Sequence, residues 1–129
     1  MTISLVTGGA GFIGSHIVEQ LISLGHEVVV VDNEYSDNEN FYWRKDTYNV
    51  NIDITDKALK NAFTNVDYVF HLAAEARIGP AIENPVNAVN INTIGTCNVL
   101  QCAREAGVKK VMYSSTSSGY GLNLSLIHI

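Results

Sequence analysis

A glycine-rich loop between an apolar run and a helical pattern is the feature that most constrains how this chain folds. Gly8, Gly11 and Gly14 stand at G-x-x-G-x-x-G spacing in the segment V-T-G-G-A-G-F-I-G-S-H. The short apolar run before the loop, residues 3–6, ends at Thr7 and predicts a buried strand. After the loop, apolar side chains recur at helical spacing as far as a glycine stop (Ile13, Ile17, Leu21, Leu24, then Gly25).

The glycine spacing points to a ligand-binding role because it lies between a predicted strand and a predicted helix. In that setting the first glycine permits a tight turn, and the second lets the backbone approach a pyrophosphate. The third lets the helix pack closely on the strand. The unpaired N–H groups and the positive end of the helix then favour phosphate groups. Because no Gly-Lys-Ser/Thr follows, a nucleoside-triphosphatase loop is disfavoured and a dinucleotide site is predicted.

An acidic residue closes the second predicted strand, residues 26–32, whose four consecutive valines suit a strand covered on both faces. Asp32 lies 18 residues after Gly14, where a carboxylate accepts hydrogen bonds from the adenosine ribose. A carboxylate there repels a 2′-phosphate, so we expect NAD as the cofactor in preference to NADP. The alternative is that the glycines only shape a turn and that Asp32 only caps a loop or helix.

Apolar runs and helical patterns alternate along the rest of the chain. We expect further strands at 48–53, 66–74 and 108–115, a short helix at 55–63 that begins at Thr55, and a long helix at 85–106 with Asn84 as its cap. The long helix carries an apolar stripe (Val86, Val89, Ile94, Cys97, Leu100 and Ala103). Because crossover helices join parallel strands, this order predicts an α/β fold with a doubly wound parallel sheet of order 3-2-1-4-5. The cofactor is expected across the carboxyl ends of the strands.

Composition and charge argue against several classes of partner. Apolar residues make up 47% of the chain and charged residues 16%, which indicates a folded domain. The net charge of −5 and the scattered cations supply no basic field, so we expect neither a nucleic-acid nor a membrane partner. Cys97 and Cys102 project about 140° apart on the predicted helix, and we predict neither a disulfide nor a metal site. Reduced cysteines and the lack of a membrane-length apolar run favour a cytoplasmic protein.

Several ordered motifs resemble those of one family. They are T-G-G-A-G-F-I-G (7–14), V-V-D-N (30–33), D-I-T-D (53–56), H-L-A-A (71–74), N-T-I-G-T (92–96) and S-S-T-S-S-G-Y-G (114–121). Together they make the chain similar to the extended short-chain dehydrogenase/reductase family. Within that family it resembles the NAD-dependent epimerase/dehydratase branch, which acts on nucleotide sugars. The resemblance runs from Thr2 to about Asn123.

The resemblance implies a role for each matched residue. Cofactor contacts are expected from Thr7, Gly8, Gly11, Phe12, Ile13, Gly14, Asp32, Asn33, Asp53, Ile54, Leu72, Ala73, Ala74 and Asn92. In the family pattern Asp53 meets the adenine amino group and Ile54 covers the ring; the alternative is that Asp53 caps the next helix. Thr116 is the implied catalytic hydroxyl, unless it serves only a turn. Residues 75–78 are expected to border the sugar pocket, where Arg77 meets a substrate charge or forms a surface salt bridge.

The family's chemistry also needs a base, which is not found in this sequence. Hydride transfer to NAD oxidises the sugar, and a tyrosine in a Tyr-x-x-x-Lys motif takes the hydroxyl proton. Tyr120 is not that base, because the residue four positions later is Leu124, and no other tyrosine here is followed by lysine at that spacing. The resemblance therefore implies that the base lies beyond Ile129 in a longer parent protein, and we expect the chain itself to bind NAD without turnover.

We expect the parent to be an NAD-dependent nucleotide-sugar epimerase of the UDP-sugar 4-epimerase type. A dehydratase or another extended short-chain dehydrogenase is one alternative, and a non-catalytic NAD-binding regulatory protein is another. In the family the 85–106 helix often contributes to a four-helix bundle between subunits, so the parent is expected to be a homodimer.

Two regions are predicted along the chain. Residues 1–123 form an NAD-binding Rossmann domain, truncated before the remaining strands and the substrate region. Residues 124–129, L-S-L-I-H-I, match a translation of the end sequence of a common sequencing-library transposon. We expect them to be a non-native tail, the alternative being a genuine short apolar tail.

Overall fold

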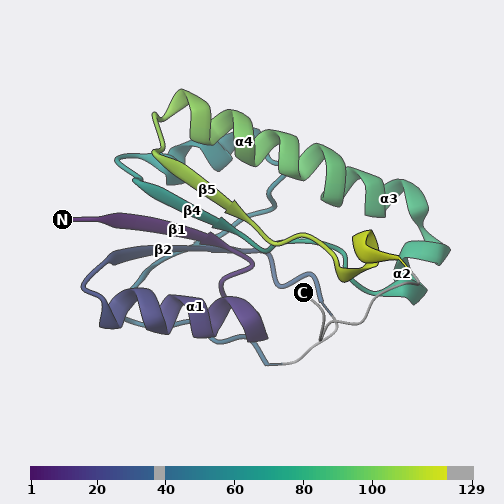
Figure 1. Ribbon diagram of the computed structural model, residues 1–129, viewed down its shortest axis with the longest axis horizontal. Coiled ribbons are helices and arrows are strands. Elements are labelled where there is room, and N and C mark those ends of the chain that lie inside the picture. The colour runs from purple at the N-terminus through teal and green to yellow at the C-terminus, as the bar shows by residue number, and fades with distance from the viewer. Residues whose placement is uncertain (37–39, 122–129) are drawn as a thin grey trace.

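A sheet of five parallel strands, in the order β3-β2-β1-β4-β5, runs through the molecule (Figure 1). The strands are β1 (Ile3–Thr7), β2 (Glu27–Asp32), β3 (Tyr48–Asn51), β4 (Tyr68–His71) and β5 (Lys110–Tyr113). This computed structural model describes residues 1–36 and 40–121, and the predicted tail at 124–129 lies outside them. The predicted α/β fold with a doubly wound parallel sheet of order 3-2-1-4-5 is confirmed.

Helices cover both faces of the sheet, as Figure 1 shows with α1 (Phe12–Ser23) on one side and α3 (Pro85–Val89) and α4 (Thr96–Glu105) on the other. The valine run of β2 contributes side chains to the hydrophobic core on both faces of the sheet. Val28 and Val30 pack in one core cluster with Val18 of α1, whereas Val29 and Val31 pack in the cluster on the opposite face. A parallel strand buried on both faces needs such a continuous apolar run, since neither set of side chains meets water.

The short helix predicted at 55–63 differs in both type and cap. It is a 3₁₀ helix, Lys57–Phe63, and Asp56 caps it by accepting a hydrogen bond from the N–H of Ala58 at 2.7 Å. The predicted cap, Thr55, instead donates its hydroxyl to Asp53 at 2.7 Å. The cap therefore moves one residue along the chain.

The helix predicted as one piece at 85–106 is a series of segments. Helix α2 (Ile78–Glu83), which the sequence patterns do not predict, precedes α3, a π-helical turn at Asn90–Gly95 and then α4. Asn84 caps α3 as predicted, because its side chain accepts the N–H of Asn87 at 3.1 Å. A π turn within a helix is frequent at functional sites, and this one carries Asn92 and Gly95.

The apolar stripe predicted on the long helix faces away from the sheet. Val86, Val89, Ile94 and Leu100 are between 48% and 79% exposed, and of the stripe only Ala103 is buried. The residues that pack towards the sheet are Ile91, Gly95, Val99, Cys102 and Ala103. Small residues on that face permit close approach, and helical spacing alone does not reveal which of two stripes meets the sheet.

Candidate cofactor-binding site

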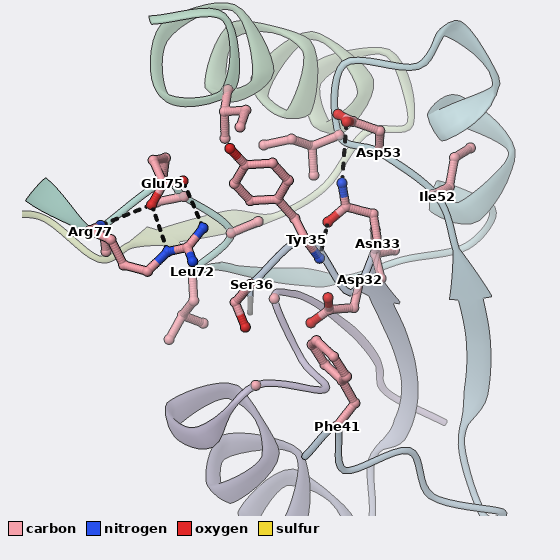
Figure 2. Close-up of a pocket in the computed structure, with 18 residues that line it drawn as sticks. Asp32, Asn33, Tyr35, Ser36, Phe41, Ile52, Asp53, Leu72, Glu75 and Arg77 are labelled. Carbon is pink, nitrogen blue, oxygen red and sulfur yellow. Dashed lines mark hydrogen bonds and ion pairs between the residues drawn. The ribbon is translucent and has the colours of Figure 1, made fainter. Parts of the chain in front are cut away.

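A pocket of about 210 Å³ opens at the carboxyl ends of the strands (Figure 2). It lies where β1 is flanked by β2 on one side and β4 on the other, which is the crevice in which open parallel sheets bind ligands. Its lining is Gly8, Gly11, Val31, Asp32, Asn33, Tyr35, Ser36, Phe41, Ile52, Asp53, Ile54, Leu72, Ala73, Ala74, Glu75, Ala76, Arg77 and Ile91. The segments that follow β1, β2, β3 and β4 therefore converge on one cavity.

At two of the three loop glycines, nearby backbone atoms leave no room for a side chain. Gly8 has φ +69°, and a Cβ there would lie 3.0 Å from the backbone nitrogen of Ala73. A Cβ on Gly14 would collide with the Gly8 carbonyl oxygen, so helix α1 can begin this close to the turn only with glycine. Gly11 differs, because a Cβ there would meet only the Gly8 carbonyl oxygen, at 3.3 Å, while the residue itself lines the pocket.

Asp32 is a carboxylate with acceptor capacity left over. Its Oδ2 accepts the N–H of Ala10 at 3.1 Å, and its Oδ1 accepts the N–H of Glu34 at 2.9 Å. Each carboxylate oxygen can accept two hydrogen bonds, so one position remains on each. Asp32 is thus fixed against the glycine loop and can still accept hydrogen bonds from two hydroxyl groups of a ligand.

Asp53 has fewer remaining hydrogen-bond acceptor positions than Asp32 and faces the same pocket from the loop after β3. Its Oδ1 accepts both the N–H and the hydroxyl of Thr55, at 2.8 and 2.7 Å. Its Oδ2 accepts the side-chain amide of Asn33 at 3.2 Å, which leaves one acceptor position (Figure 2). Asp53 can therefore accept one ligand N–H, and the bond from Asn33 ties it to the loop that follows Asp32.

Helix α4 fixes the loop that carries Asp53. The side-chain amide of Asn98 donates to the carbonyl oxygens of Ile54 and Asp56 at 2.7 and 3.1 Å. Gly95 lies against the Ile54 side chain, since a Cβ on Gly95 would be 2.5 Å from its Cδ1. The apolar wall of the pocket at Ile54 thus depends on contacts from the helix behind it.

A buried hydrogen-bond chain holds the floor of the pocket behind Leu72 and Ala73. The Thr7 hydroxyl accepts the N–H groups of both residues, at 3.1 and 3.2 Å, and lies 2.6 Å from Nδ1 of His71. Nε2 of His71 lies 2.9 Å from the Thr96 hydroxyl on α4. Burial lowers the pKa of His71 to about 4, so the ring is neutral at pH 7.

The far wall of the pocket is formed by the segment after β4. The carboxylate of Glu75 forms an ion pair with Arg77 at 3.1 Å, and its side chain is 2% exposed. Asn92 of the π turn bonds the Glu75 backbone twice: its Oδ1 accepts the N–H at 2.8 Å and its Nδ2 donates to the carbonyl at 3.0 Å. Figure 2 shows Tyr35, from the loop after β2, reaching towards this wall.

The structure gathers most of the sequence-predicted cofactor residues around one pocket. Those in its lining are Gly8, Gly11, Asp32, Asn33, Asp53, Ile54, Leu72, Ala73 and Ala74. The others lie outside the lining: Thr7 and Asn92 hold lining segments from behind, Gly14 permits the loop's close packing, and Phe12 and Ile13 begin α1 with exposed side chains.

Thr116 follows β5, outside the pocket lining, and its hydroxyl accepts the N–H of Ser118 at 3.2 Å. Sequence reasoning missed Tyr35, Ser36, Phe41 and Ile52, which come from a polar stretch and a weak strand without a recognisable motif. No group of three or more His, Cys, Asp or Glu that would suit a metal ion occurs within residues 1–36 and 40–121. Within the same residues, no helix combines the length and apolar character needed to cross a membrane.

Sequence comparison places this chain among known proteins. The model of the NAD dependent epimerase/dehydratase family matches residues 4–127. A putative UDP-glucose 4-epimerase of Methanocaldococcus jannaschii is 42% identical over 120 residues, which cover 91% of this chain and 39% of that protein. A UDP-N-acetyl-alpha-D-glucosaminuronate decarboxylase of Bacillus cytotoxicus is 43% identical over 121 residues, covering 91% of this chain and 37% of that protein.

Solved structures give the same grouping. The UDP-glucose 4-epimerase of Thermotoga maritima, solved with UDP-glucose, superposes with a TM-score of 0.86 at 36% identity and covers 97% of this chain. The UDP-glucose 4-epimerase of Thermus thermophilus, solved with NAD, superposes with a TM-score of 0.81 at 38% identity and covers 89% of this chain. The alignments cover 41% and 38% of those two chains, so this chain spans less than half of each relative described here.

Proposed function

Because this chain belongs to the NAD-dependent epimerase/dehydratase family, we propose that it is the NAD-binding part of a nucleotide-sugar epimerase. The observation that carries the proposal is the pocket at the carboxyl ends of the strands. There the glycine loop faces Asp32 and Asp53, and both carboxylates keep acceptor positions for a ligand. The Thermus thermophilus relative solved with NAD supports the choice of cofactor.

The donor and acceptor set fits an adenine dinucleotide. Asp32 accepts hydrogen bonds from two ribose hydroxyls, Asp53 accepts one from the adenine amino group, and Ile54 covers the ring. The backbone at Gly11 and the start of α1, with its positive end, hold the pyrophosphate. Leu72, Ala73 and Ala74 form the side of the pocket that continues towards β5 and Thr116. When bound, NAD supplies an acceptor for a hydride from the sugar and a donor for its return.

The same residues favour NAD over NADP. A 2′-phosphate on the adenosine ribose would sit beside the Asp32 carboxylate, and like charges at that distance repel. Two backbone N–H groups hold Asp32 in place, so it cannot swing away without losing them. The described lining contains three carboxylates and a single cation, Arg77, which Glu75 already binds.

The sugar reaction is proposed from the relatives. Both solved structures described above are UDP-glucose 4-epimerases, so an epimerase acting on a UDP-sugar is favoured, and the dehydratase alternative is not. Decarboxylation of a UDP-sugar acid is a class that the sequence motifs did not suggest, and it stands as the second candidate because of the 43% identical Bacillus cytotoxicus relative. In either reaction Thr116 orients the sugar hydroxyl.

Activity of the longer protein tests the sugar proposal. We expect the longer parent protein to contain a Tyr-x-x-x-Lys motif. Once expressed, it should interconvert UDP-glucose and UDP-galactose. Thr116→Val should lower kcat at least about tenfold, while Thr116→Ser retains most of the rate because the hydroxyl remains. An extended protein that binds NAD without that motif would instead support the non-catalytic alternative.

Dimerisation of the longer protein is proposed from an uncovered apolar face. Ile78 and Ile82 of α2, Val86 and Val89 of α3, and Ile94 and Leu100 are each 48% or more exposed. Apolar patches of this kind mark association surfaces. Light scattering should give twice the monomer mass, and Val86→Glu combined with Leu100→Glu should shift it to the monomer mass. A monomeric wild type would contradict the dimer proposal.

A further inference from the structure

A buried carboxylate in the wall of the pocket is the starting point. The Oε1 of Glu75 accepts the backbone N–H of Arg77 at 2.9 Å and its Nε–H at 3.1 Å, while Oε2 accepts Nη2 at 3.1 Å. Burial alone would raise the pKa of Glu75, but its pKa is lowered overall, chiefly by the hydrogen bonds from Arg77. Glu75 is therefore a buried anion that holds Arg77 in place.

Tyr35 connects its own loop, after β2, to Arg77 and to α3. Its ring lies under the guanidinium of Arg77, with 5.6 Å between Cζ and the ring centre. Its hydroxyl accepts the side-chain amide of Asn87 on α3 at 2.8 Å.

The backbone of Tyr35 ties this arrangement to the opposite side of the pocket. Its N–H donates to Oδ1 of Asn33 at 3.2 Å, and the Asn33 amide donates to Asp53. Tyr35 thus spans from the Asp32–Asp53 side of the pocket to the wall after β4 (Figure 2). A dinucleotide that runs from the β2 side to the β4 side must follow the same path, with the glycine loop on its other flank.

We propose that Tyr35 is a positioning residue that retains the bound dinucleotide by forming a clasp with Asn87 and with Arg77, which Glu75 holds in place. The inference rests on the proposed binding of NAD in this pocket. The clasp encloses the middle of the cofactor between Tyr35 and the glycine loop, and the cofactor leaves only when Tyr35 separates from Arg77 and Asn87. The clasp therefore acts mainly on the dissociation rate.

Stopped-flow fluorescence of NADH on the 129-residue chain tests this directly. Tyr35→Ala should raise the dissociation rate about tenfold and change the association rate by less than about threefold. Tyr35→Phe keeps the ring under Arg77, so it should give a smaller increase, and Asn87→Ala should resemble it. Tyr48→Phe, an exposed tyrosine on β3 outside the pocket, is the matched control and should leave both rates unchanged.

The outcomes separate this inference from the proposed function. If the folded wild-type chain binds no NADH, both the cofactor proposal and the clasp are overturned. If the wild type binds NADH but all the Tyr35 and Asn87 variants dissociate at its rate, only the clasp is overturned. Thermal melts of each variant report folding, and if Tyr35→Ala fails to fold, Tyr35→Phe and Asn87→Ala decide, since both remove the hydrogen bond between these two side chains and neither residue is buried.

Discussion

The hydroxyl of Thr7 lies 2.6 Å from Nδ1 of His71, and this contact fixes the tautomer of the histidine. Both lone pairs of that hydroxyl are engaged by the N–H groups of Leu72 and Ala73, so its proton points to Nδ1. The ring proton therefore resides on Nε2 and is donated to the hydroxyl of Thr96. One neutral histidine thus links β1, β4 and α4 beneath the pocket.

Removing the Thr7 hydroxyl should therefore destabilise the fold. In Thr7→Val, the Ala73 N–H and Nδ1 of His71 lose their partner inside the protein, and we expect a loss of about 3 kcal/mol in the free energy of unfolding. Thr7→Ser keeps the hydroxyl and loses only a buried methyl group, so about 1 kcal/mol is expected. Urea denaturation of both variants measures the difference, and equal losses would contradict the hydrogen-bond chain.

Acid should weaken the fold through His71. The unfolded chain takes up this proton near pH 6.5 but the folded chain only near pH 4, so the unfolded state binds more protons in between and stability falls as the pH drops. From pH 7 to pH 5 the loss from this residue should be about 2 kcal/mol. His71→Gln should show a correspondingly flatter pH dependence in urea denaturation. The other titratable groups are common to both proteins. If the free energy of unfolding had the same pH dependence in both, that result would count against a buried neutral histidine.

Alanine substitutions at Gly14 and Gly11 should have different effects, the first on stability and the second on NAD binding. Gly14→Ala places a Cβ against the Gly8 carbonyl oxygen, and we expect a strongly destabilised protein, by more than about 3 kcal/mol. Gly11→Ala meets only one backbone oxygen, at 3.3 Å, so the chain should remain folded while its methyl group enters the pocket and weakens NAD binding about tenfold or more. Thermal melts paired with calorimetry distinguish the two, and a Gly11→Ala variant with unchanged NAD affinity would show that the pyrophosphate does not approach this residue.

Gly95 and Ile54 should behave as a coupled pair. In Gly95→Ala the new methyl group would lie 2.5 Å from Cδ1 of Ile54, which must move, and we expect a loss of about 1–3 kcal/mol. Ile54→Ala removes the atoms that collide, so the double variant should be more stable than the sum of the two single losses predicts. A double-mutant cycle by urea denaturation measures the coupling. Additive losses would contradict the contact.

The sequence was sufficient to predict the fold because its local signals agree. The valine run of β2, the glycine stop at Gly25 with φ +86° and the loop around Gly8 each dictate a conformation with little help from the rest of the chain. Asp32 could be placed at the pocket for the same reason. A residue that ends a parallel strand next to such a loop has only one edge of the sheet on which to lie.

The parts that could not be predicted depend on contacts between distant segments. Tyr35 and Arg77 are 42 positions apart and meet only because β2 and β4 flank β1. The stripe through Val86 and Leu100 has the spacing of a buried face, yet the sheet is met by the opposite face, whose small residues pack closer. The π turn at Asn90–Gly95 has no sequence pattern of its own, and its geometry accompanies the bonds from Asn92 to the Glu75 backbone.

Calorimetric titration of the 129-residue chain with NAD and with NADP tests the central claim most directly. We predict that one NAD binds per chain and that NADP binds at least about tenfold more weakly, because its 2′-phosphate meets the Asp32 carboxylate. Asp32→Ala should weaken NAD binding about tenfold and narrow the difference between the two cofactors. A folded chain that binds no NAD, or one whose NAD affinity is unchanged by Asp32→Ala, would contradict the account.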